Sequence, residues 1–275
     1  MLRLKSKYKK ALVTGGSSGL GYEFVNMLLN QGVKVWTTSR SYKKNLKKKN
    51  LYYKILDLKD PDSINNFGIS IIKEVPDLDL VINNAGSGDF GYFQDFTIQD
   101  IENQLQIILK GPIQMSHIFF KLFKIKNKGT LVNVSSLASQ FPIPYMSLYN
   151  SAKAGLSSFT RSLQLEAINS NITIIDFQPG DYRTDFNKSI NVRTNSNKNY
   201  NNLNLAKVWN NIEKNLENGP IARHAANNLK HILHKKISSS TITGSLFQAK
   251  LVPFLARIAS WSIIRFCIAK YYGLK

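Results

Sequence analysis

Three side chains between Ser136 and Lys153 have the types and spacing to act together on a carbonyl group: the hydroxyl of Ser136, the phenol of Tyr149 and the amine of Lys153. If a helix begins near Tyr149, Lys153 lies one turn further along the same face. A neighbouring ammonium favours the phenolate, so we expect it to lower the pKa of Tyr149 from the usual value of about 10. Such a tyrosine is a general acid and base. Because Y-x-x-x-K alone is a common surface pair, this interpretation depends on the rest of the chain.

A glycine-rich segment near the N-terminus has the spacing of a nucleotide-binding loop. The apolar run Ala11–Thr14 is followed by GGSSGLG and then by apolar residues at helical spacing, which predicts strand, loop and helix. Gly15, Gly19 and Gly21 allow a tight turn and a close approach of the backbone to a ligand. The free N–H groups that begin the helix suit a pyrophosphate, although a plain structural turn is the alternative.

The end of the second expected strand favours NADP over NAD. This strand, Val33–Thr38, leads into Ser39 and Arg40. In dinucleotide-binding folds this position faces the adenosine ribose, where a basic side chain favours a 2′-phosphate. We therefore expect NADP(H), with an ordinary surface arginine as the alternative.

Strands and helices alternate along most of the chain. Further strands are expected at residues 51–57, 78–82, 130–134, 172–177 and 240–244. Helices are expected at residues 61–73, 97–126, from 149 onward, 205–216 and 220–234, with a bend or break at Gly111–Pro112. This order predicts a single-domain α/β fold with a Rossmann-type, doubly wound parallel sheet in three layers, spanning residues 1–245. Ligands of such folds bind at the carboxyl ends of the strands.

Two segments fall outside this alternation. Residues 186–204 are polar and rich in asparagine, and we interpret them as a substrate lid, with a disordered loop as the alternative. Residues 246–275 alternate apolar patches with basic residues, which predicts an amphipathic helical extension. Packing of this tail against protein is favoured, and a peripheral contact with a membrane is the alternative.

The composition is globular, with an excess of positive charge. Lys and Arg total 37 against 17 Asp and Glu, so the net charge is +20. Nucleic acid, an anionic membrane or an acidic ligand would each suit this charge, as would a merely solvated surface. No nucleic-acid motif accompanies the charge, and we expect no such partner. Cys267 is the only cysteine, which excludes an internal disulfide and a multi-cysteine metal site. With no apolar leader sequence evident, a cytoplasmic location and no metal are expected.

Taken together, five motifs resemble the classical short-chain dehydrogenase/reductase family over about Lys10 to Asp185. They are TGGSSGLG at Thr14–Gly21, Asp57, NNAG at Asn83–Gly86, the set Ser136, Tyr149 and Lys153, and Pro179–Gly180. The resemblance implies an oxidoreductase that transfers hydride between NADP(H) and a carbonyl or secondary alcohol. It also implies a homodimer or homotetramer that pairs through helices around Gln104–Lys124 and Asn150–Ile168.

The resemblance assigns a role to each matching residue. Ser136 would bind the substrate oxygen, Tyr149 would transfer its proton, and Lys153 would lower the tyrosine pKa and bind the nicotinamide ribose. Cofactor contacts would come from Thr14, Gly15, Ser17, Ser18, Gly19, Leu20, Gly21, Ser39, Arg40, Asp57, Leu58, Asn83, Ala85, Gly86, Tyr149, Lys153, Pro179, Gly180 and Thr184. Among these, Arg40 would bind the 2′-phosphate, Asp57 the adenine amino group, Asn83 the ribose and Thr184 the region of the carboxamide.

Two residues depart from the family pattern. Ile108 stands where the family has an asparagine that holds a water of the proton relay, and Tyr182 stands where an aliphatic residue is usual. Ile108 motivates an alternative function, a cofactor-binding regulatory protein with little turnover. The GSGDFG segment and the apolar, basic tail resemble the hydroxysteroid and retinol dehydrogenase branch, which implies a bulky or lipid-like substrate. Its pocket would be formed by Phe90, Phe93, Phe141, Ile143, Tyr145 and Met146, with core packing as the alternative.

Overall fold

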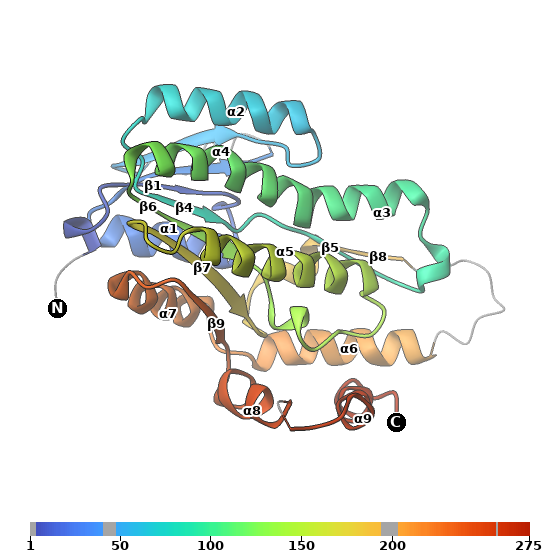
Figure 1. Ribbon diagram of the computed structural model, residues 1–275. Helices are drawn as coiled ribbons and strands as arrows, with labels where there is room; N and C mark the ends of the chain where they lie inside the picture. The colour runs from blue at the N-terminus through green and yellow to red at the C-terminus, as the bar shows by residue number, and fades with distance from the viewer. Residues whose placement is uncertain (1–3, 41–47, 194–202, 257) are drawn as a thin grey trace.

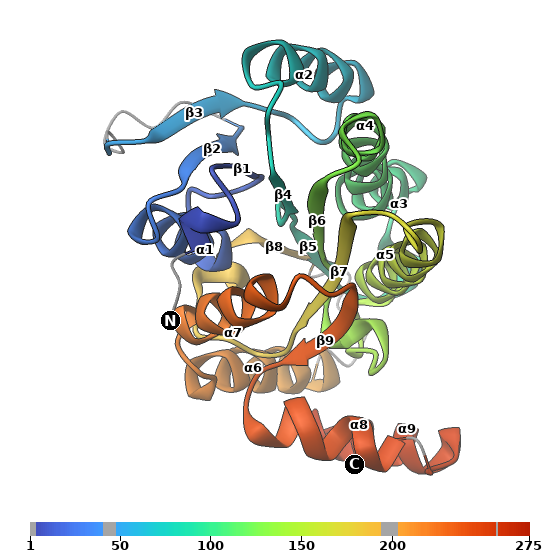
Figure 2. The same ribbon diagram turned by 60° about the vertical axis from the view of Figure 1, so that its left-hand side comes forward.

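The chain is built around a seven-stranded parallel sheet with helices on both faces (Figure 1, Figure 2). The computed structural model describes residues 4–40, 48–193, 203–256 and 258–275. From β1 the strand order runs to β2 and β3 on one side and to β4, β6, β7 and β9 on the other. The predicted doubly wound, three-layer, single-domain fold is therefore confirmed. The strands are β1 (Lys10–Val13), β2 (Lys34–Ser39), β3 (Leu51–Ile55), β4 (Leu80–Asn83), β6 (Gly129–Val134), β7 (Ile172–Pro179) and β9 (Ser239–Thr243).

Two cores hold the layers together because the central strands are apolar on both faces. Ala11 and Val13 of β1 face the core beneath one pair of helices, whereas Leu12 faces the opposite core. This burial on both faces explains why the strands read as continuous apolar runs. The first core lies under α1 (Gly19–Asn30) and α7 (Ala222–Lys235), and the second under α2 (Pro61–Glu74), α4 (Gly111–Lys126) and α5 (Ser147–Glu166).

The break predicted at Gly111–Pro112 is replaced by a π-helical turn. Helix α3 (Ile98–Leu105) continues through this turn at Gln106–Lys110 directly into α4. A proline ring clashes with the carbonyl four residues earlier and donates no hydrogen bond, and a wider turn before it relieves both problems. The chain thus runs from Ile98 to Lys126 without leaving helical geometry.

Two elements near the sheet's carboxyl edge were not predicted. Strands β5 (Gly88–Phe90) and β8 (Ile190–Val192) form a small parallel sheet. Strand β8 and the short 3-10 helix Asp185–Ser189 occupy the first half of the proposed lid, while residues 194–202 of that lid lie outside the described residues. Helix α6 (Leu203–Asn218) follows.

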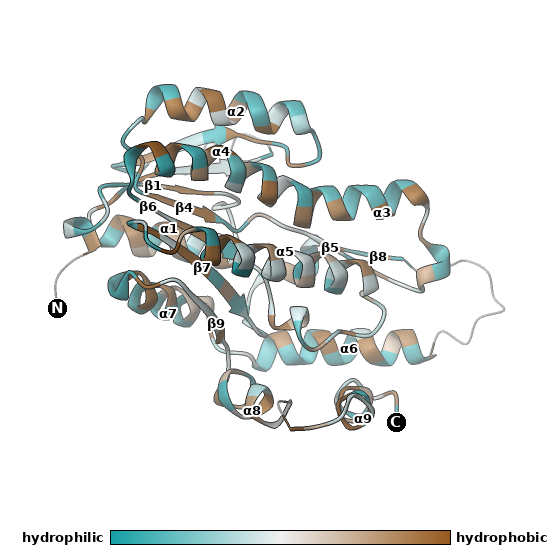
Figure 3. Cartoon of the chain, viewed as in Figure 1, coloured by the Kyte–Doolittle hydropathy of each residue, from teal (hydrophilic) through white to brown (hydrophobic). Residues whose placement is uncertain are grey.

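The C-terminal residues form a separate layer next to α6 and β9 (Figure 1, Figure 2). This layer contains a π-helical turn at Phe247–Leu251, then α8 (Val252–Ala256) and α9 (Trp261–Tyr271). Apolar residues are frequent in both helices (Figure 3). Within the described part of the chain, no helix has both the length and the apolar character needed to cross a bilayer.

Candidate active site

A cavity of about 950 Å³ lies where the parallel strands end, as expected for this fold. Ser136, Tyr149 and Lys153 all line it, although Ser136 follows β6 and the other two lie on α5. The predicted cofactor residues that also line it are Gly15, Ser17, Ser18, Gly19, Leu20, Gly21, Ser39, Arg40, Asp57, Leu58, Ala85, Gly86, Pro179, Gly180 and Thr184. One cavity therefore joins the proposed catalytic residues to the glycine loop.

Thr14 and Asn83, by contrast, were predicted to contact the cofactor but do not line the cavity. The Thr14 hydroxyl accepts hydrogen bonds from the backbone N–H groups of Asn84 and Ala85, at 2.9 and 3.0 Å. The Asn83 amide points into the core, where it donates to Asn133 Oδ1 at 2.8 Å and Ser116 Oγ at 3.1 Å. These two side chains stabilise the ends of the strands through hydrogen bonds. The neighbouring residue Asn84 lines the cavity instead.

The glycine loop fits a pyrophosphate because it requires glycine and presents a helix end without a side-chain cap. A Cβ on Gly21 would lie 2.2 Å from the carbonyl oxygen of Gly15, and one on Gly15 would lie 2.9 Å from Ala85 Cα. Gly19, which begins α1, has φ +54°. The side chain of the N-cap residue Ser18 makes no capping hydrogen bond. The first N–H groups of α1 are thus available to an anion at the cavity wall.

The proposed catalytic groups lie close together around the Tyr149 side chain. Tyr149 and Lys153 lie one turn apart on the buried face of α5, and Lys153 Nζ is 5.8 Å from the Tyr149 ring centroid. Ser136, at the end of β6, is hydrogen-bonded to the Tyr149 phenol. Its Oγ also accepts from the N–H of Ala138 at 3.1 Å. The predicted proximity of the three residues is confirmed.

The predicted lowering of the tyrosine pKa is wrong for this state of the protein. Burial raises the pKa of Tyr149 to about 12. The hydrogen bond with Ser136 lowers this pKa and the negative charge of Asp181 raises it, but both effects are smaller than that of burial. The Lys153 ammonium donates to the carbonyl oxygen of Val134 at 2.7 Å. Burial also lowers the pKa of Lys153 to about 8. Desolvation of the phenol therefore sets the direction of the shift, and the Lys153 amine is engaged with a backbone carbonyl rather than with the phenol.

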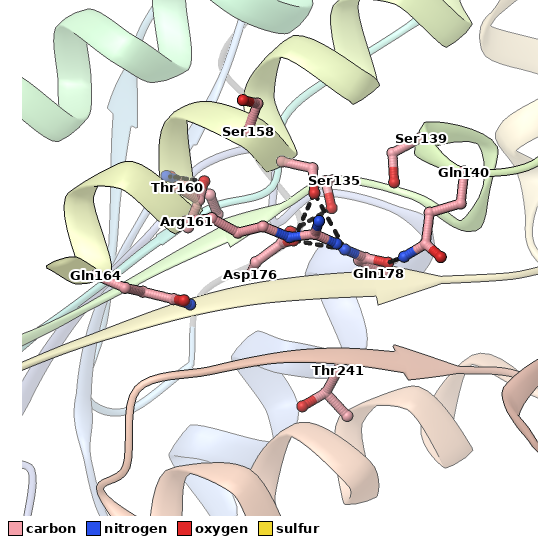
Figure 4. Close-up of polar contacts among 12 residues, drawn as sticks. Ser135, Ser139, Gln140, Ser158, Thr160, Arg161, Gln164, Asp176, Gln178 and Thr241 are labelled. Atoms are coloured by element: carbon pink, nitrogen blue, oxygen red, sulfur yellow. Dashed lines mark hydrogen bonds and ion pairs between the residues drawn. The ribbon is translucent and has the colours of Figure 1, made fainter. Parts of the chain in front are cut away.

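A buried carboxylate, which the sequence interpretation missed, underlies this site. Asp176 of β7 accepts hydrogen bonds from Ser135 Oγ, from Ser157 Oγ at 2.7 Å and from Gln178 Nε2 at 2.5 Å. Arg161 lies at its outer side, with Nε 3.9 Å from the carboxylate (Figure 4). The sequence does contain a signal for this buried carboxylate, because Asp176 is the one acidic residue within the mainly apolar run ITIIDFQP.

This carboxylate links the strand and the helix that carry the proposed catalytic residues. Ser135 precedes Ser136 in the chain, and Ser157 lies one turn beyond Lys153 on α5. The negative charge of Asp176 also partly offsets the lowering of the Lys153 pKa. Asp176 thus favours the ammonium form of Lys153 without contacting the cavity.

The C-terminal layer is tied to the loop that follows β7. Gln248 Nε2 donates to Asp181 Oδ2 at 2.5 Å, and the Asp181 N–H donates to Gln248 Oε1 at 3.1 Å. The Tyr271 hydroxyl donates to the same carboxylate at 3.5 Å. Burial raises the pKa of Asp181, against the effect of these hydrogen bonds. The tail therefore forms part of the cavity, as Gln248, Tyr271 and Tyr272 line it.

The predicted substrate pocket is only partly correct. Phe141, Ile143 and Met146 line the cavity. Phe90 is instead buried against Tyr145 and Trp209, and Phe93 is exposed. The pocket wall that sequence reasoning missed comes from Ile107, Phe186, Ile190, Ile212, Leu216, Phe247, Val252, Ile258, Ile263, Ile264, Cys267 and Ile268.

The two departures from the family pattern have different surroundings. Ile108 is buried in an apolar cluster that includes Tyr149 and Ala152, and its neighbour Ile107 is the residue at the cavity wall. An isoleucine side chain provides no hydrogen-bonding group there. Tyr182 is buried, and its hydroxyl lies 3.5 Å from His224 Nδ1.

Comparisons with known proteins agree with the fold described above. A family model described as short chain dehydrogenase matches residues 9–195. The chain is 28% identical over 272 residues to a 3-ketodihydrosphingosine reductase of Bacteroides thetaiotaomicron, covering 96% of this chain and 98% of the relative. It is 33% identical over 195 residues to an NADPH-dependent 1-acyldihydroxyacetone phosphate reductase of Saccharomyces cerevisiae, covering 67% of this chain and 65% of the relative. A solved short-chain dehydrogenase from Streptomyces avermitilis has the same fold, with a TM-score of 0.79 at 20% identity over 94% of this chain and 97% of that chain.

Proposed function

Because the chain belongs to the short-chain dehydrogenase family, we propose that it is an NADP(H)-dependent oxidoreductase acting on a carbonyl group or the corresponding secondary alcohol. The observation that carries the proposal is the convergence of Ser136, Tyr149 and Lys153 in one cavity with the glycine loop. The first test is oxidation of NADPH by the purified protein over a panel of short- and long-chain ketones and aldehydes. Tight NADPH binding without turnover across the panel would instead support the regulatory alternative.

In the proposed reaction, bound nicotinamide supplies the hydride and the protein supplies orientation and the proton. Ser136 holds the carbonyl oxygen, and Tyr149 donates its proton to that oxygen as the alcohol forms. The raised pKa keeps Tyr149 in its phenol form near neutral pH, which suits the direction of carbonyl reduction. Lys153 stabilises the resulting phenolate and binds the nicotinamide ribose.

We propose a bulky or lipid-like apolar substrate. Much of the cavity lining consists of aliphatic and aromatic side chains from several elements, including Met146, Ile212 and Ile268. The names of two relatives, a ketodihydrosphingosine reductase and an acyldihydroxyacetone phosphate reductase, also specify substrates with long apolar chains. Placement in the hydroxysteroid and retinol dehydrogenase branch stays a prediction.

Arg40 is the residue that we propose for recognition of the 2′-phosphate, since it lines the cavity at the end of β2. We expect Arg40→Ala to raise the NADPH dissociation constant at least about tenfold and to change that of NADH less than about twofold, because one charged hydrogen-bonded contact contributes roughly 1.5–3 kcal/mol. Cofactor titration by fluorescence measures both constants. Lys121→Ala, on the exposed face of α4, removes the same charge at a distance and is the control. Equal losses for both cofactors in Arg40→Ala would contradict this assignment.

We propose that α4 and α5 pair across a two-fold axis to form a homodimer or homotetramer. The exposed side of α5 carries the small residues Ser151, Ser158 and Ser162, which permit close helix packing. We expect Ser158→Trp to weaken dimerisation at least about tenfold because its bulk would separate the helices. Sedimentation velocity measures this, with Ser70→Trp on exposed α2 as the control. A monomeric wild-type protein would refute the proposed pairing.

The proposed domains and the proposed membrane contact follow the division of the chain at residue 245. We propose that residues 1–245 form the oxidoreductase domain, with residues 186–204 as its substrate lid, and that residues 246–275 form an extension able to contact a membrane surface. Phe186 and Ile190 support the lid assignment because they line the cavity. A cytoplasmic location is proposed because Cys267 is an exposed free thiol, which suits a reducing compartment.

A further inference from the structure

The C-terminal layer exposes an unusual concentration of large apolar side chains. We define the C-terminal surface as Leu246, Phe247, Phe254, Ile258, Trp261, Ile263 and Phe266, all of which are exposed. Trp261 and Phe266 of α9 keep 57% and 51% of their area accessible, and α9 contains no buried residue. Large apolar side chains that stay exposed along one short segment are typical of a surface that binds an apolar partner.

The charges around this surface favour an anionic partner. From Asn218 to the end of the chain the sequence contains no Asp or Glu, so every formal side-chain charge there is positive or, for histidine, potentially positive. Exposed Lys250, Arg265, Lys270 and Lys275 accompany the apolar residues of the C-terminal surface. In a two-fold contact between two copies, the same patch meets itself, and these cations would face one another. Anionic lipid headgroups would neutralise them, while the aromatic and aliphatic side chains enter the headgroup region.

The same helices form the outer wall of the cavity. Ile258, Ile263, Cys267 and Tyr271 line the cavity and are also exposed, so the cavity reaches the protein surface at α9. The helices are anchored from within, since Asn211 Nδ2 donates to the carbonyl oxygen of Tyr272 at 3.1 Å and Gln248 binds Asp181. A partner on the C-terminal surface would therefore lie beside the mouth of the cavity.

We propose that residues 246–275 bind the surface of an anionic phospholipid bilayer through the C-terminal surface, and that the apolar chain of the substrate enters the cavity from that bilayer between α9 and the body of the protein. The binding step stands on the exposed residues and their charges alone. The entry step rests on the proposed reductase function.

Vesicle co-sedimentation tests the binding step. We expect the protein to bind vesicles of phosphatidylcholine with phosphatidylglycerol at least about tenfold more strongly than pure phosphatidylcholine vesicles, and to lose this preference as salt rises. Trp261→Glu and Phe266→Glu, whose side chains do not line the cavity, should each lower binding at least about tenfold. Ile69→Glu, at a 60% exposed site of α2, is the matched control and should bind like wild type. Circular dichroism verifies that each variant is folded.

Three results would overturn the binding step: no vesicle binding by the wild type, equal binding to neutral and anionic vesicles, or unchanged binding by both tail variants. Sedimentation velocity tests whether a second copy of the chain, rather than a bilayer, covers the C-terminal surface. If Phe266→Glu dissociates an oligomer while vesicles bind neither protein, the C-terminal surface is a contact between subunits and the proposal fails.

Two carbonyl substrates distinguish an effect on substrate entry from the bilayer from an effect on the reduction step. With a water-soluble ketone, Phe266→Glu should match the wild-type rate, whereas with a long-chain ketone embedded in anionic vesicles it should be at least about tenfold slower. Equal rates of wild type and variant on the embedded ketone would overturn the entry route. If the wild type reduces neither ketone but still binds vesicles, the proposed reductase function fails and the entry route fails with it, while the binding step stands.

Discussion

Tyr149→Phe will lower NADPH-linked carbonyl reduction by about a thousandfold and leave the NADPH dissociation constant within about threefold of the wild-type value. The phenol is the proposed proton donor, and positioned acid catalysis contributes roughly 10²–10⁴ in rate. Phenylalanine preserves the ring that packs against Phe186, at a centroid distance of 5.9 Å, so the cavity wall is retained. Steady-state kinetics and cofactor fluorescence measure the two quantities separately.

Tyr145→Phe is the matched control for this variant. Tyr145 precedes the same helix but does not line the cavity, so removing its hydroxyl should change turnover less than about threefold. Wild-type turnover in Tyr149→Phe would remove the tyrosine from the mechanism. A large loss in both variants would point to general damage to this part of the fold.

Lys153→Met will make the protein less active and more stable. Activity should fall at least about a hundredfold because the phenolate loses its cationic partner. The lowered pKa of Lys153, about 8, shows that its buried ammonium opposes folding. Methionine removes this cost of roughly 3 kcal/mol but leaves the carbonyl oxygen of Val134 without its donor, so a net gain of about 2 kcal/mol in unfolding free energy is expected at pH 7.

The pH dependence of this gain follows from the direction of the pKa shift. Below pH 8 Lys153 is protonated in both the folded and unfolded states, and the cost of burying the charge is present in full. As pH rises from about 8 to 10.5, the folded state loses this proton first, so the wild-type protein regains stability relative to the variant. Urea unfolding at pH 7 and pH 10 measures the difference. Lys73→Met, at an exposed site of α2, is the control, and an equal gain in both variants at both pH values would contradict the proposed cost.

Local sequence signals were sufficient to predict the parallel sheet. The apolar strands, the glycine loop and the strand-helix alternation each depend on residues close together in the chain, and the observed strand order agrees with them. The same signals predicted that Ser136, Tyr149 and Lys153 would meet, because a strand end and a helix start in this fold share one edge of the sheet.

The errors came from properties that depend on tertiary contacts. Side chains at a strand end alternate in direction, so a difference of one position sends Asn83 into the core and leaves Asn84 at the cavity. The Tyr149 pKa depends on burial by segments remote in sequence. Likewise, the tail joins the cavity through the Gln248–Asp181 contact, whose partners are 67 residues apart. No local pattern encodes a contact of that length.

The most direct test of the proposed chemistry follows the hydride itself. Wild-type protein is incubated with a ketone and NADPH deuterated at the transferable C4 position, and the alcohol is analysed by mass spectrometry. We predict one deuterium on the former carbonyl carbon of the alcohol made by the wild type, and no detectable labelled alcohol from Tyr149→Phe over the same time. An alcohol without deuterium, or equal labelling by the two proteins, would contradict hydride transfer assisted by Tyr149.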